Sequence, residues 1–273
     1  MAAAMSKEFG HTVVVDNRPG ANTIIGMDLV SKSVPDGYTL ITTSSTLAIN
    51  ATLYPKLPYD SVKSFQPISL VGSSPLIVAV PVSSPITSIA ALIAAAKAKA
   101  GELSYPSAGT GNATHLGGEL FAAMAGIKLL HVPYKGSAPG ITDLIAGRMS
   151  VVFSMSASVL PHVKSGKLRA LATTGAKRSA VLPDLPTIAE AGLPGYEMLN
   201  WLGLFAPAGT PRTVVEKLSA EAVRIMSPPE ARGRLHARGA EPSPLGAEEF
   251  TAFVKSEVEK WAKVVAATSM IAD

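Results

Sequence analysis

The amino-acid sequence predicts an α/β fold, because short apolar runs alternate with longer segments of helical periodicity along the whole chain. Each run is bounded by glycine, proline or other turn-forming residues, as strands are. The predicted strands occupy residues 12–16, 38–43, 76–81, 103–107, 129–134, 150–154, 169–174 and 202–207. Strands that alternate with helices favour mixed, mainly parallel sheets flanked by helices on both faces.

Three segments carry the clearest helical signals. Residues 89–101 follow two possible N-caps, Thr87 and Ser88, and end on a glycine. A second helix begins after Thr210 and Pro211, a position that suits proline. In the last helix, one apolar face repeats at helical spacing through Phe250, Phe253, Val254, Val258, Trp261 and Val265.

Length, charge and composition exclude several classes of protein. A chain of 273 residues can form two domains or one large α/β unit. The net charge of +4 is mild and its basic residues are dispersed, so we expect no nucleic-acid partner. The absence of cysteine excludes disulfides and thiolate chemistry. No apolar run is long enough to span a membrane, and Lys7 and Glu8 interrupt what a signal peptide would need as its apolar core.

Two stretches have the composition of crossings between domains. The first is Ala100–Ser104, where an alanine-rich helix ends and a strand begins, and the second is NWLGLFAPAGTP, residues 200–211. We therefore predict a discontinuous first domain, residues 1–102 and 205–273, and a second domain, residues 103–204. Trp201 is interpreted as a core aromatic residue in preference to a hinge residue.

The first candidate binding loop is YPSAGTGNATHLGGELF, residues 105–121. A strand ends there, and Thr114 can cap a helix that starts near His115. Free backbone N–H groups at such a turn attract an anion, with help from the helix dipole. The alternative is an ordinary N-cap with tight-turn glycines. The loop matches neither the dinucleotide fingerprint nor the P-loop. Further side-chain donors are supplied by Ser107, Thr110 and Asn112.

The second candidate loop is HVPYKGSAPG, residues 131–140, which again joins a strand to a helix, with Pro139 near the first helical position. Gly136 allows close approach of the backbone, and the N–H groups of Gly136 and Ser137 can point at an oxyanion. Lys135 either adds charge or is simply solvated. Ligands of open α/β sheets bind beyond the carboxyl ends of strands. Two such loops together predict a binding function.

Catalysis is the weaker alternative. The sequence has no G-x-S-x-G and no H-E-x-x-H motif, and its five histidines are too dispersed for a metal site, so we expect no metal or cofactor. A hydrolase could use Ser107 with His115, or Ser137 with His131, as nucleophile and base. No acidic residue lies nearby in sequence to orient either histidine.

These loops and their flanks resemble the Bug (TctC-like) family of solute-binding receptors of tripartite tricarboxylate transporters. The similarity runs over nearly the whole chain, in family order. It is carried by VVVDNRPGANTIIGMDLVSKSVPDGYTL, LSYPSAGTGNATHLGGELF, VPYKGSAPGITDLIAGR, LPHVKSGKLRALATT, LPDLPTIAEAGLPGYE and FAPAGTPRTVVEKL.

The resemblance implies a two-domain fold like that of type II periplasmic binding proteins, with a small carboxylate held between the domains and no catalysis. It also implies periplasmic localisation, a monomeric receptor, and integral membrane transporter subunits as partners. The residues matching the carboxylate-binding loops are Ser107, Gly109, Thr110, Asn112 and Thr114, together with Tyr134, Lys135, Gly136, Ser137 and Ala138.

Other positions refine this expectation. Ser44 and Ser45 belong to a hydroxyl-rich stretch that either lines the site from the first domain or forms an ordinary turn. Ser154 stands where many relatives carry an acidic residue, which favours a plain carboxylate over an amino acid as ligand. Asn22 and Thr23 replace a double glycine of the family and are interpreted as adjusting a helix cap.

The resemblance also implies a signal peptide and a first strand with a Pro-Gly-Gly loop ahead of the first helix. The sequence begins within that helix. We therefore expect the first sheet to lack a strand and to expose apolar surface. A truncated fragment that binds no ligand remains a further alternative.

Overall fold

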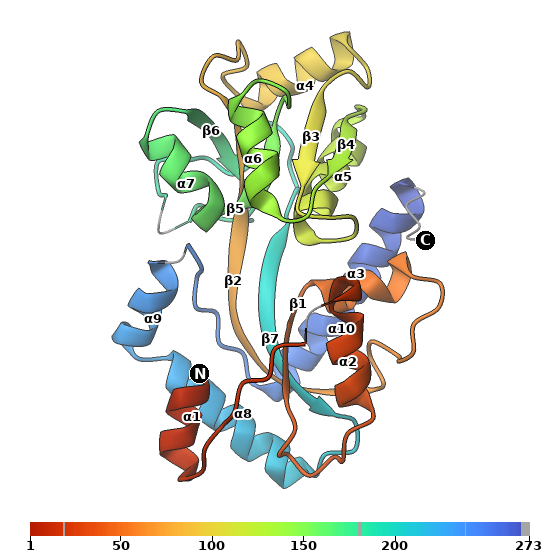
Figure 1. Ribbon diagram of the computed structural model, residues 1–273, viewed down its shortest axis with the longest axis vertical. Helices are drawn as coiled ribbons and strands as arrows, with labels where there is room; N and C mark the ends of the chain where they lie inside the picture. Colours follow the sequence, from red (N-terminus) through yellow and green to blue (C-terminus); the bar gives the residue numbers. More distant parts are fainter. Residues whose placement is uncertain (19, 180–181, 238, 269–273) are drawn as a thin grey trace.

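The computed structural model describes residues 1–18, 20–179, 182–237 and 239–268. Figure 1 shows two lobes joined by the long strands β2 (Phe65–Pro81) and β7 (Leu199–Pro207). The lower lobe contains α1 (Ala2–Phe9), η1 (Ala21–Thr23), α2 (Ile24–Ser31), β1 (Ile41–Ser44), α3 (Thr46–Leu53), α8 (Arg212–Met226), α9 (Pro229–His236) and α10 (Ala247–Thr268). The upper lobe contains α4 (Ile89–Ala98), β3 (Ser104–Ser107), α5 (Ala113–Ala125), β4 (Leu130–Pro133), α6 (Ser137–Ile145), β5 (Val152–Met155), α7 (Ser156–Lys164) and β6 (Leu168–Thr173). The predicted α/β class is confirmed.

The strand pairing is mixed but differs from the predicted, mainly parallel arrangement. Strand β2 pairs antiparallel with β7, β5 and β6, and β1 pairs antiparallel with β7. Only β3 and β4 form a parallel pair among the described strands. The pairing is mainly antiparallel because β2 and β7 run between the lobes in opposite directions. Strand β2 is the neighbour of β5, β6 and β7, and β7 is also the neighbour of β1. Helix α5 makes the crossover that a parallel β3–β4 pair needs.

Strands β1 to β7 cover seven of the eight predicted apolar runs. The exception is residues 12–16, which form no strand; Val14 and Val15 are 80% and 67% exposed. Among the described strands, none pairs with this segment. Conversely, the sequence did not predict the first part of β2, because Pro67, Gly72 and Pro75 resemble turn residues. Irregularities in the register with β7 accommodate two of them, between Pro67 and Ser69 and between Leu70 and Gly72.

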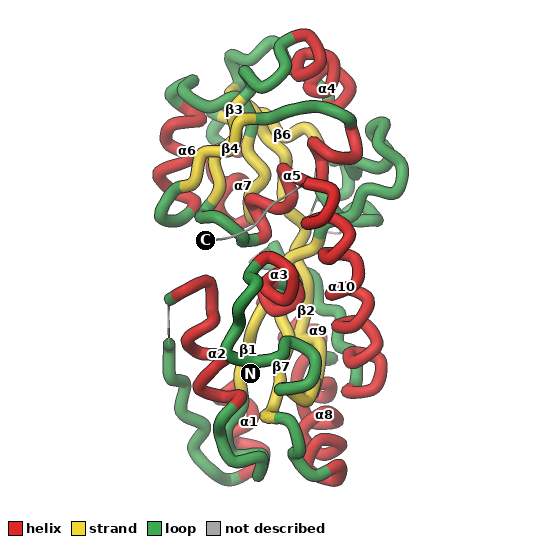
Figure 2. The backbone as a smooth tube through the Cα atoms, turned by 90° about the vertical axis from the view of Figure 1, so that its right-hand side faces the viewer, coloured by secondary structure: helices red, strands yellow, loops and turns green. Residues whose placement is uncertain are grey.

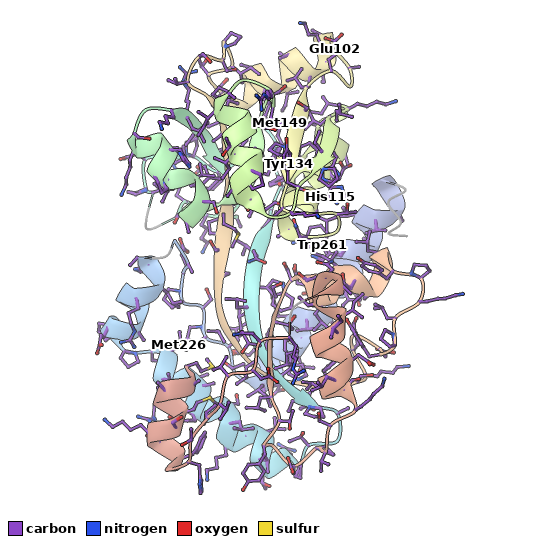
Figure 3. The ribbon with its side chains drawn as sticks, viewed as in Figure 1. Glu102, His115, Tyr134, Met149, Met226 and Trp261 are labelled. Carbon is purple, nitrogen blue, oxygen red and sulfur yellow. The ribbon has the colours of Figure 1, made fainter. Side chains whose placement is uncertain are left out.

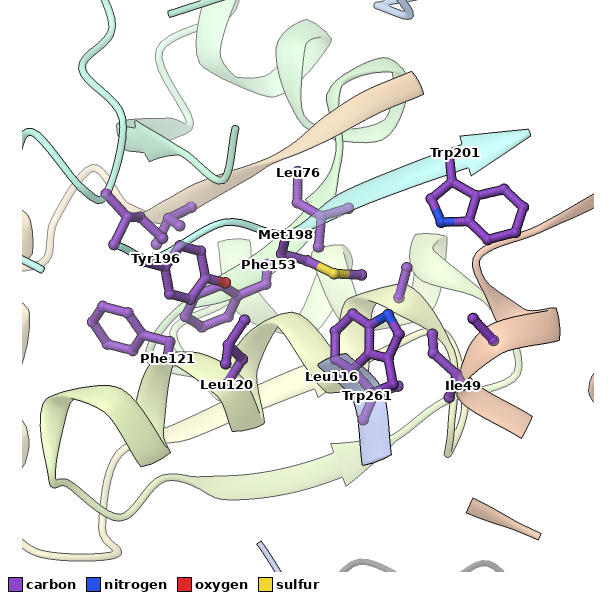
Figure 4. Close-up of a cluster of buried hydrophobic side chains, with 14 of the residues drawn as sticks. Ile49, Leu76, Leu116, Leu120, Phe121, Phe153, Tyr196, Met198, Trp201 and Trp261 are labelled. Carbon is purple, nitrogen blue, oxygen red and sulfur yellow. The ribbon is translucent and has the colours of Figure 1, made fainter. Parts of the chain in front are cut away.

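The core is continuous between the lobes. Figure 4 shows aromatic and aliphatic side chains from both, among them Ile49 of α3 and Leu116 of α5, in one cluster. Trp201 is fully buried there, which confirms its interpretation as a core residue. Its Nε1–H donates to Glu257 Oε2 at 2.9 Å, and Trp261 Nε1–H donates to the same oxygen at 3.2 Å. Helix α10 therefore anchors the crossing strand β7, and it contacts both α3 and α5 (Figure 2).

The helix predictions are confirmed with small changes at the ends. Ser88 is the N-cap of α4, and its hydroxyl accepts a hydrogen bond from the Ala91 N–H at 3.1 Å. Helix α8 begins directly after Pro211. In α10 the residues Phe250, Val254 and Trp261 are buried as predicted. None of the helices in the described ranges combines the length and apolar character needed to cross a bilayer.

The position of α4 bears on the predicted domain boundary at residue 102. Helix α4 lies at the top of the upper lobe in Figure 1. Its preceding loop is held by Arg169 of β6, whose guanidinium donates to the carbonyls of Val82, Ser84 and Ile86. Residues 76–81 of β2 pair with β5 and β6, while residues 65–75 pair with β7. This packing favours a division within β2, and the boundary itself remains a prediction.

Candidate functional site

The two loops predicted to bind an anion lie side by side. Strands β3 and β4 are parallel neighbours, with Ser107 opposite Pro133 at their carboxyl ends. The chain continues this pairing beyond the strands, since the Tyr134 N–H donates to the Ser107 carbonyl at 3.0 Å and the Gly136 N–H donates to the Ala108 carbonyl at 3.3 Å. Both loops therefore form one continuous edge of the upper lobe, toward the junction with the lower lobe (Figures 1 and 3).

Side-chain hydrogen bonds hold the first loop in shape. The N-cap of α5 is Asn112, not Thr114 as predicted: Asn112 Oδ1 accepts from the N–H groups of Thr114 and His115 at 2.9 and 3.2 Å. Thr114 Oγ1 donates to Asn112 Oδ1 at 2.6 Å and accepts from the Ala108 N–H at 2.9 Å. The threonine therefore bridges the two ends of the turn, because its hydroxyl is both donor and acceptor.

Several backbone donors of the loops are already occupied. The Gly109 N–H donates to Ser107 Oγ at 3.2 Å, and the Gly111 N–H donates to His115 Nδ1 at 3.1 Å. Because the Gly136 N–H bonds the first loop, the prediction that it faces an oxyanion is wrong for this conformation. Within the described ranges, no acceptor bonds the amides of Thr110, Ser137 or Ala138.

Helix α6 begins at Ser137 after Gly136, whose φ of 105° favours glycine. Pro139 is therefore its third residue, further in than predicted. The N–H groups of Ser137 and Ala138 are orphan donors of its first turn and carry the positive end of the helix dipole. Together with the Thr110 amide, they are free donors that an anion could use at this edge.

A stacked pair of histidines supports the first loop from behind. The rings of His115 and His131 lie 3.8 Å apart between centroids, at an angle of 25°. His131 Nε2 is 2.6 Å from Ser107 Oγ. His115 is 5% exposed, and Figure 3 shows it near the junction of the lobes. Each ring thus holds a different residue of the same loop.

Both histidines are neutral at pH 7. Burial lowers the pKa of His115 to about 3, and the neighbouring His131 contributes to the shift. Burial lowers the pKa of His131 to about 4. Because His115 Nδ1 accepts the Gly111 N–H, its proton resides on Nε2, which faces Glu119 Oε1 at 3.9 Å. The expectation that no acidic residue lies near this histidine in sequence is therefore wrong, since Glu119 follows it by four positions. The hydrogen bond from Gly111 requires a neutral His115, since only the neutral ring offers an acceptor nitrogen.

Neither of the couples predicted for a hydrolase is formed. His115 bonds Gly111 instead of Ser107, and His131 bonds Ser107 instead of Ser137. Ser107 itself is 3% exposed, and its hydroxyl also lies 3.0 Å from the Gly109 carbonyl. The geometry of this pair is that of a loop support.

The side chains of the second loop differ in their surroundings. Tyr134 Oη donates to Asp143 Oδ2 at 2.6 Å, and Arg148 donates to the other oxygen of that carboxylate at 2.9 Å. These hydrogen bonds hold the pKa of Asp143 below its ordinary value. Lys135 is exposed, as is Ala138. Lys135 is therefore free to meet an incoming anion, although nothing in the loop orients it.

The predicted residues outside these loops are largely inaccessible. Ser45 is fully buried; its hydroxyl donates to Asn200 Oδ1 at 3.1 Å, and its N–H donates to the Trp201 carbonyl at 3.1 Å. Ser44 Oγ is 2.8 Å from Thr46 Oγ1. Ser154 is 1% exposed, and its hydroxyl has no hydrogen-bond partner among the described residues. In this conformation a ligand cannot reach Ser45 or Ser154.

Sequence reasoning did not assign Asn22 and Asn50 to the site. Asn22 Nδ2 donates to Asn50 Oδ1 at 2.9 Å and to the Gly111 carbonyl at 3.2 Å. Asn50 Nδ2 returns a hydrogen bond to the Asn22 carbonyl at 2.9 Å. Asn22 therefore connects the lower lobe to the candidate loop. Its presence in a turn where the family has glycine was the available signal, because asparagine tolerates positive φ.

The unpaired backbone amides and neutral polar groups of this edge are chemically suited to a small anion. Within the described residues, no group of histidine, aspartate and glutamate side chains is arranged to hold a metal ion.

Residues 1–270 match the family described as the tripartite tricarboxylate transporter family receptor, TctC. The chain belongs to this family.

Two curated proteins are similar to this chain over nearly its whole length. A UPF0065 protein in the tcbD-tcbE intergenic region of Pseudomonas sp. (strain P51) is 42% identical over 262 residues, which cover 96% of this chain and 78% of that protein. Protein BugT of Bordetella pertussis is 35% identical over 270 residues, covering 98% of this chain and 83% of BugT.

Solved structures agree with the TctC fold. R. palustris Rpa4515 with adipate superposes with a TM-score of 0.88 at 35% identity, over 99% of this chain and 91% of that one. MatC (Rpa3494) of Rhodopseudomonas palustris, with bound malate, gives a TM-score of 0.82 at 28% identity, over 97% of this chain and 91% of MatC. The predicted periplasmic-binding-protein-like fold is therefore confirmed. The TctC family comprises solute-binding receptors. Adipate and malate, the ligands in these two similar structures, are dicarboxylates.

Proposed function

We propose that this chain is a periplasmic receptor that captures a small carboxylate between its two lobes and delivers it to the membrane subunits of a tripartite tricarboxylate transporter. The observation that carries the proposal is the pair of hydrogen-bonded loops after β3 and β4, with free amides at the N-terminus of α6. Amides at a helix N-terminus are suited to a carboxylate, since they combine donors with a positive dipole end.

The proposed site has two kinds of residue. Direct contacts come from the accessible part of the loops, namely Thr110, Asn112, Tyr134, Lys135, Ser137 and Ala138, while Gly109 and Gly136 hold the loops in shape through their own N–H groups. Ser107 and Thr114 shape the first loop from within, and Ser45 holds the turn between β1 and α3 against β7. Ser44 and Ser154 contribute no negative charge, which suits an anionic ligand.

The ligand class follows from the donors and is sharpened by the relatives. Backbone amides recognise a carboxylate without regard to what it is attached to, so the loops define one end of the ligand. The adipate and malate bound by the two similar proteins each carry a second carboxylate. We infer a small dicarboxylate, whose second carboxylate faces the lower lobe when the lobes close.

A receptor explains the loops better than a hydrolase does. A serine nucleophile must present its hydroxyl to the substrate, whereas Ser107 is buried against His131 and the Gly109 backbone. The neutral histidines hold backbone groups in place. We therefore propose that the protein turns over no substrate.

The decisive experiment removes one amide donor from the N-terminus of α6. Ser137→Pro deletes the N–H at the first helical position, where proline is well tolerated, and Ser137→Ala removes only the hydroxyl. Binding of adipate, malate and other small carboxylates is measured by calorimetry and thermal shift. A ligand at about 100 times its dissociation constant stabilises the protein by about 2.7 kcal/mol, which is readily visible.

We expect at least one dicarboxylate to stabilise the parent protein. Ser137→Pro should then weaken its binding about tenfold or more, as expected for a lost charge-assisted hydrogen bond of about 1.5–3 kcal/mol, while Ser137→Ala binds nearly as the parent does. Equal affinity in the proline variant would remove the α6 terminus from the site. A parent protein that responds to no carboxylate would contradict the proposed function and favour the non-binding alternative.

A further inference from the structure

A short strained turn in the lower lobe touches the candidate loop of the upper lobe. Ala21, Asn22 and Thr23 have φ angles of 44°, 49° and 73°, three consecutive non-glycine residues in the left-handed region. Asparagine adopts this region more readily than most residues, but for a β-branched threonine it is a genuine outlier. Such strain persists only where surrounding contacts hold it, and it is concentrated at functional positions.

The contact that accompanies this strain is made by Asn22. Its side-chain amide has two protons; one is donated to Asn50 Oδ1 at 2.9 Å and the other to the Gly111 carbonyl at 3.2 Å. Asn50 is fully buried on α3 and bonds the Asn22 backbone in return. The amide is thus oriented from within the lower lobe before it reaches across to Gly111.

Gly111 is held from both lobes. Its N–H donates to His115 Nδ1 within the upper lobe, while its carbonyl accepts from Asn22. A Cβ at this position would lie 2.4 Å from Leu53 Cδ2 and 3.2 Å from Asn22 Nδ2, so the backbone here is packed directly against the lower lobe. The loop that carries Thr110 and Asn112 is therefore fastened at its midpoint.

We propose that Asn22 is a positioning residue, a latch that fastens the ligand loop to the lower lobe and stabilises the closed arrangement of the lobes. It acts through Gly111 and does not contact the ligand. The proposal rests on the proposed receptor function for its consequence, which is higher affinity. When a ligand binds only the closed state, its apparent affinity falls in proportion to the fraction of closed molecules.

The test compares two substitutions in the same turn. Asn22→Gly removes the amide and accepts positive φ freely, so it should fold; Asn22→Asp keeps the backbone preference but replaces the donor by an acceptor that faces two oxygens. Thr23→Gly is the matched control, since it removes a side chain and a strained φ but leaves the contact to Gly111 intact.

Lobe closure is measured directly and without ligand. The chain contains no cysteine, so a pair of spin labels at exposed Lys56 and Lys128, introduced as Lys56→Cys and Lys128→Cys, reports one distance between the lobes. We expect a predominantly short distance in the parent and in Thr23→Gly. Asn22→Gly and Asn22→Asp should shift the distribution to longer distances, and adipate should bind them about fivefold more weakly if the closed fraction falls by that factor.

Two results would overturn the latch. One is an Asn22→Gly distribution that matches Thr23→Gly, and the other is a parent protein that is open without ligand, because the Asn22–Gly111 bond would then be absent. The distance measurement needs no ligand. A failure of adipate binding alone therefore counts against the proposed function, while the latch is judged by the distances.

Discussion

Two turns meet at the junction of the lobes, and they reach similar backbone conformations by different means. In the upper-lobe loop, positive φ angles fall on glycines, Gly109 at 137° and Gly111 at 78°. In the lower-lobe turn they fall on Ala21, Asn22 and Thr23. Glycine adopts these angles without steric cost, whereas the other residues are strained.

The difference shows what each turn is selected for. The upper loop needs close backbone approach, because Leu53 leaves no room for a Cβ at Gly111. The lower turn uses a side chain, because the Asn22 amide nitrogen reaches the Gly111 carbonyl at 3.2 Å. Backbone strain in the lower turn is thus the cost of a contact that glycine cannot make. Three predictions test how these turns are held in place.

Gly111→Ala should be strongly destabilising. The new Cβ would clash with Leu53 Cδ2 at 2.4 Å, and the φ of 78° adds backbone strain. We expect a loss of about 2–4 kcal/mol in the free energy of unfolding, measured with urea. Gly101→Ala is the matched control: its φ is 79°, but nothing lies within 4 Å of its Cβ. It should lose only about 1–2 kcal/mol, and equal losses would show that packing between the lobes contributes nothing.

Acidification should destabilise the upper loop selectively. The pKa values of His115 and His131 fall from 6.5 to about 3 and about 4 on folding, so the unfolded chain binds more protons in this window. The contribution of the two histidines to the free energy of unfolding is therefore fully present above about pH 6.5. It is lost as the pH falls toward their folded-state pKa values, by up to about 1.4 kcal/mol per pH unit for each histidine. Thermal unfolding across pH 4–7 measures the slope.

Two substitutions identify the source of that slope. His115→Asn retains an acceptor near the position of Nδ1, and His131→Gln retains a polar group near that of Nε2, but neither titrates. Each should flatten the dependence of the melting temperature on pH. A slope that is unchanged in the double variant would assign it to other groups.

Thr23→Gly should have the smallest effect and the opposite sign. Relief of the strained φ of 73° should outweigh the greater flexibility of glycine in the unfolded chain, for a gain of about 0.5–1 kcal/mol in the free energy of unfolding. Ala123→Gly in α5 carries the same flexibility penalty without any relief and should lose about 1 kcal/mol. A loss in both variants would mean that Thr23 is not strained.

Much of the architecture follows from local patterns in the sequence. The periodic face of Phe250, Val254 and Trp261 predicts α10, because the buried face of an amphipathic helix shows in its own spacing. The short run at 103–107, bounded by turn residues, predicts β3, which is buried along its whole length. The two binding loops were predicted for the same reason, since helix starts after strands have recognisable turn residues. The segment 12–16 shows the limit: its valines match a strand, but a strand requires a pairing partner, and none of the described strands pairs with it.

The tertiary structure alone decided how the loops are held. No local pattern shows that His131 contacts Ser107, that the Gly136 N–H donates to the Ala108 carbonyl, or that Asn22 contacts Gly111 across 89 positions of sequence. These contacts join residues that are distant in the chain, and their energies depend on distances of a few ångströms that only packing sets. Sequence by itself determined the family, most of the elements and the two candidate loops, because these depend on local patterns; packing within the upper lobe determined which backbone donors of those loops remain unpaired, because their partners come from other turns of the chain.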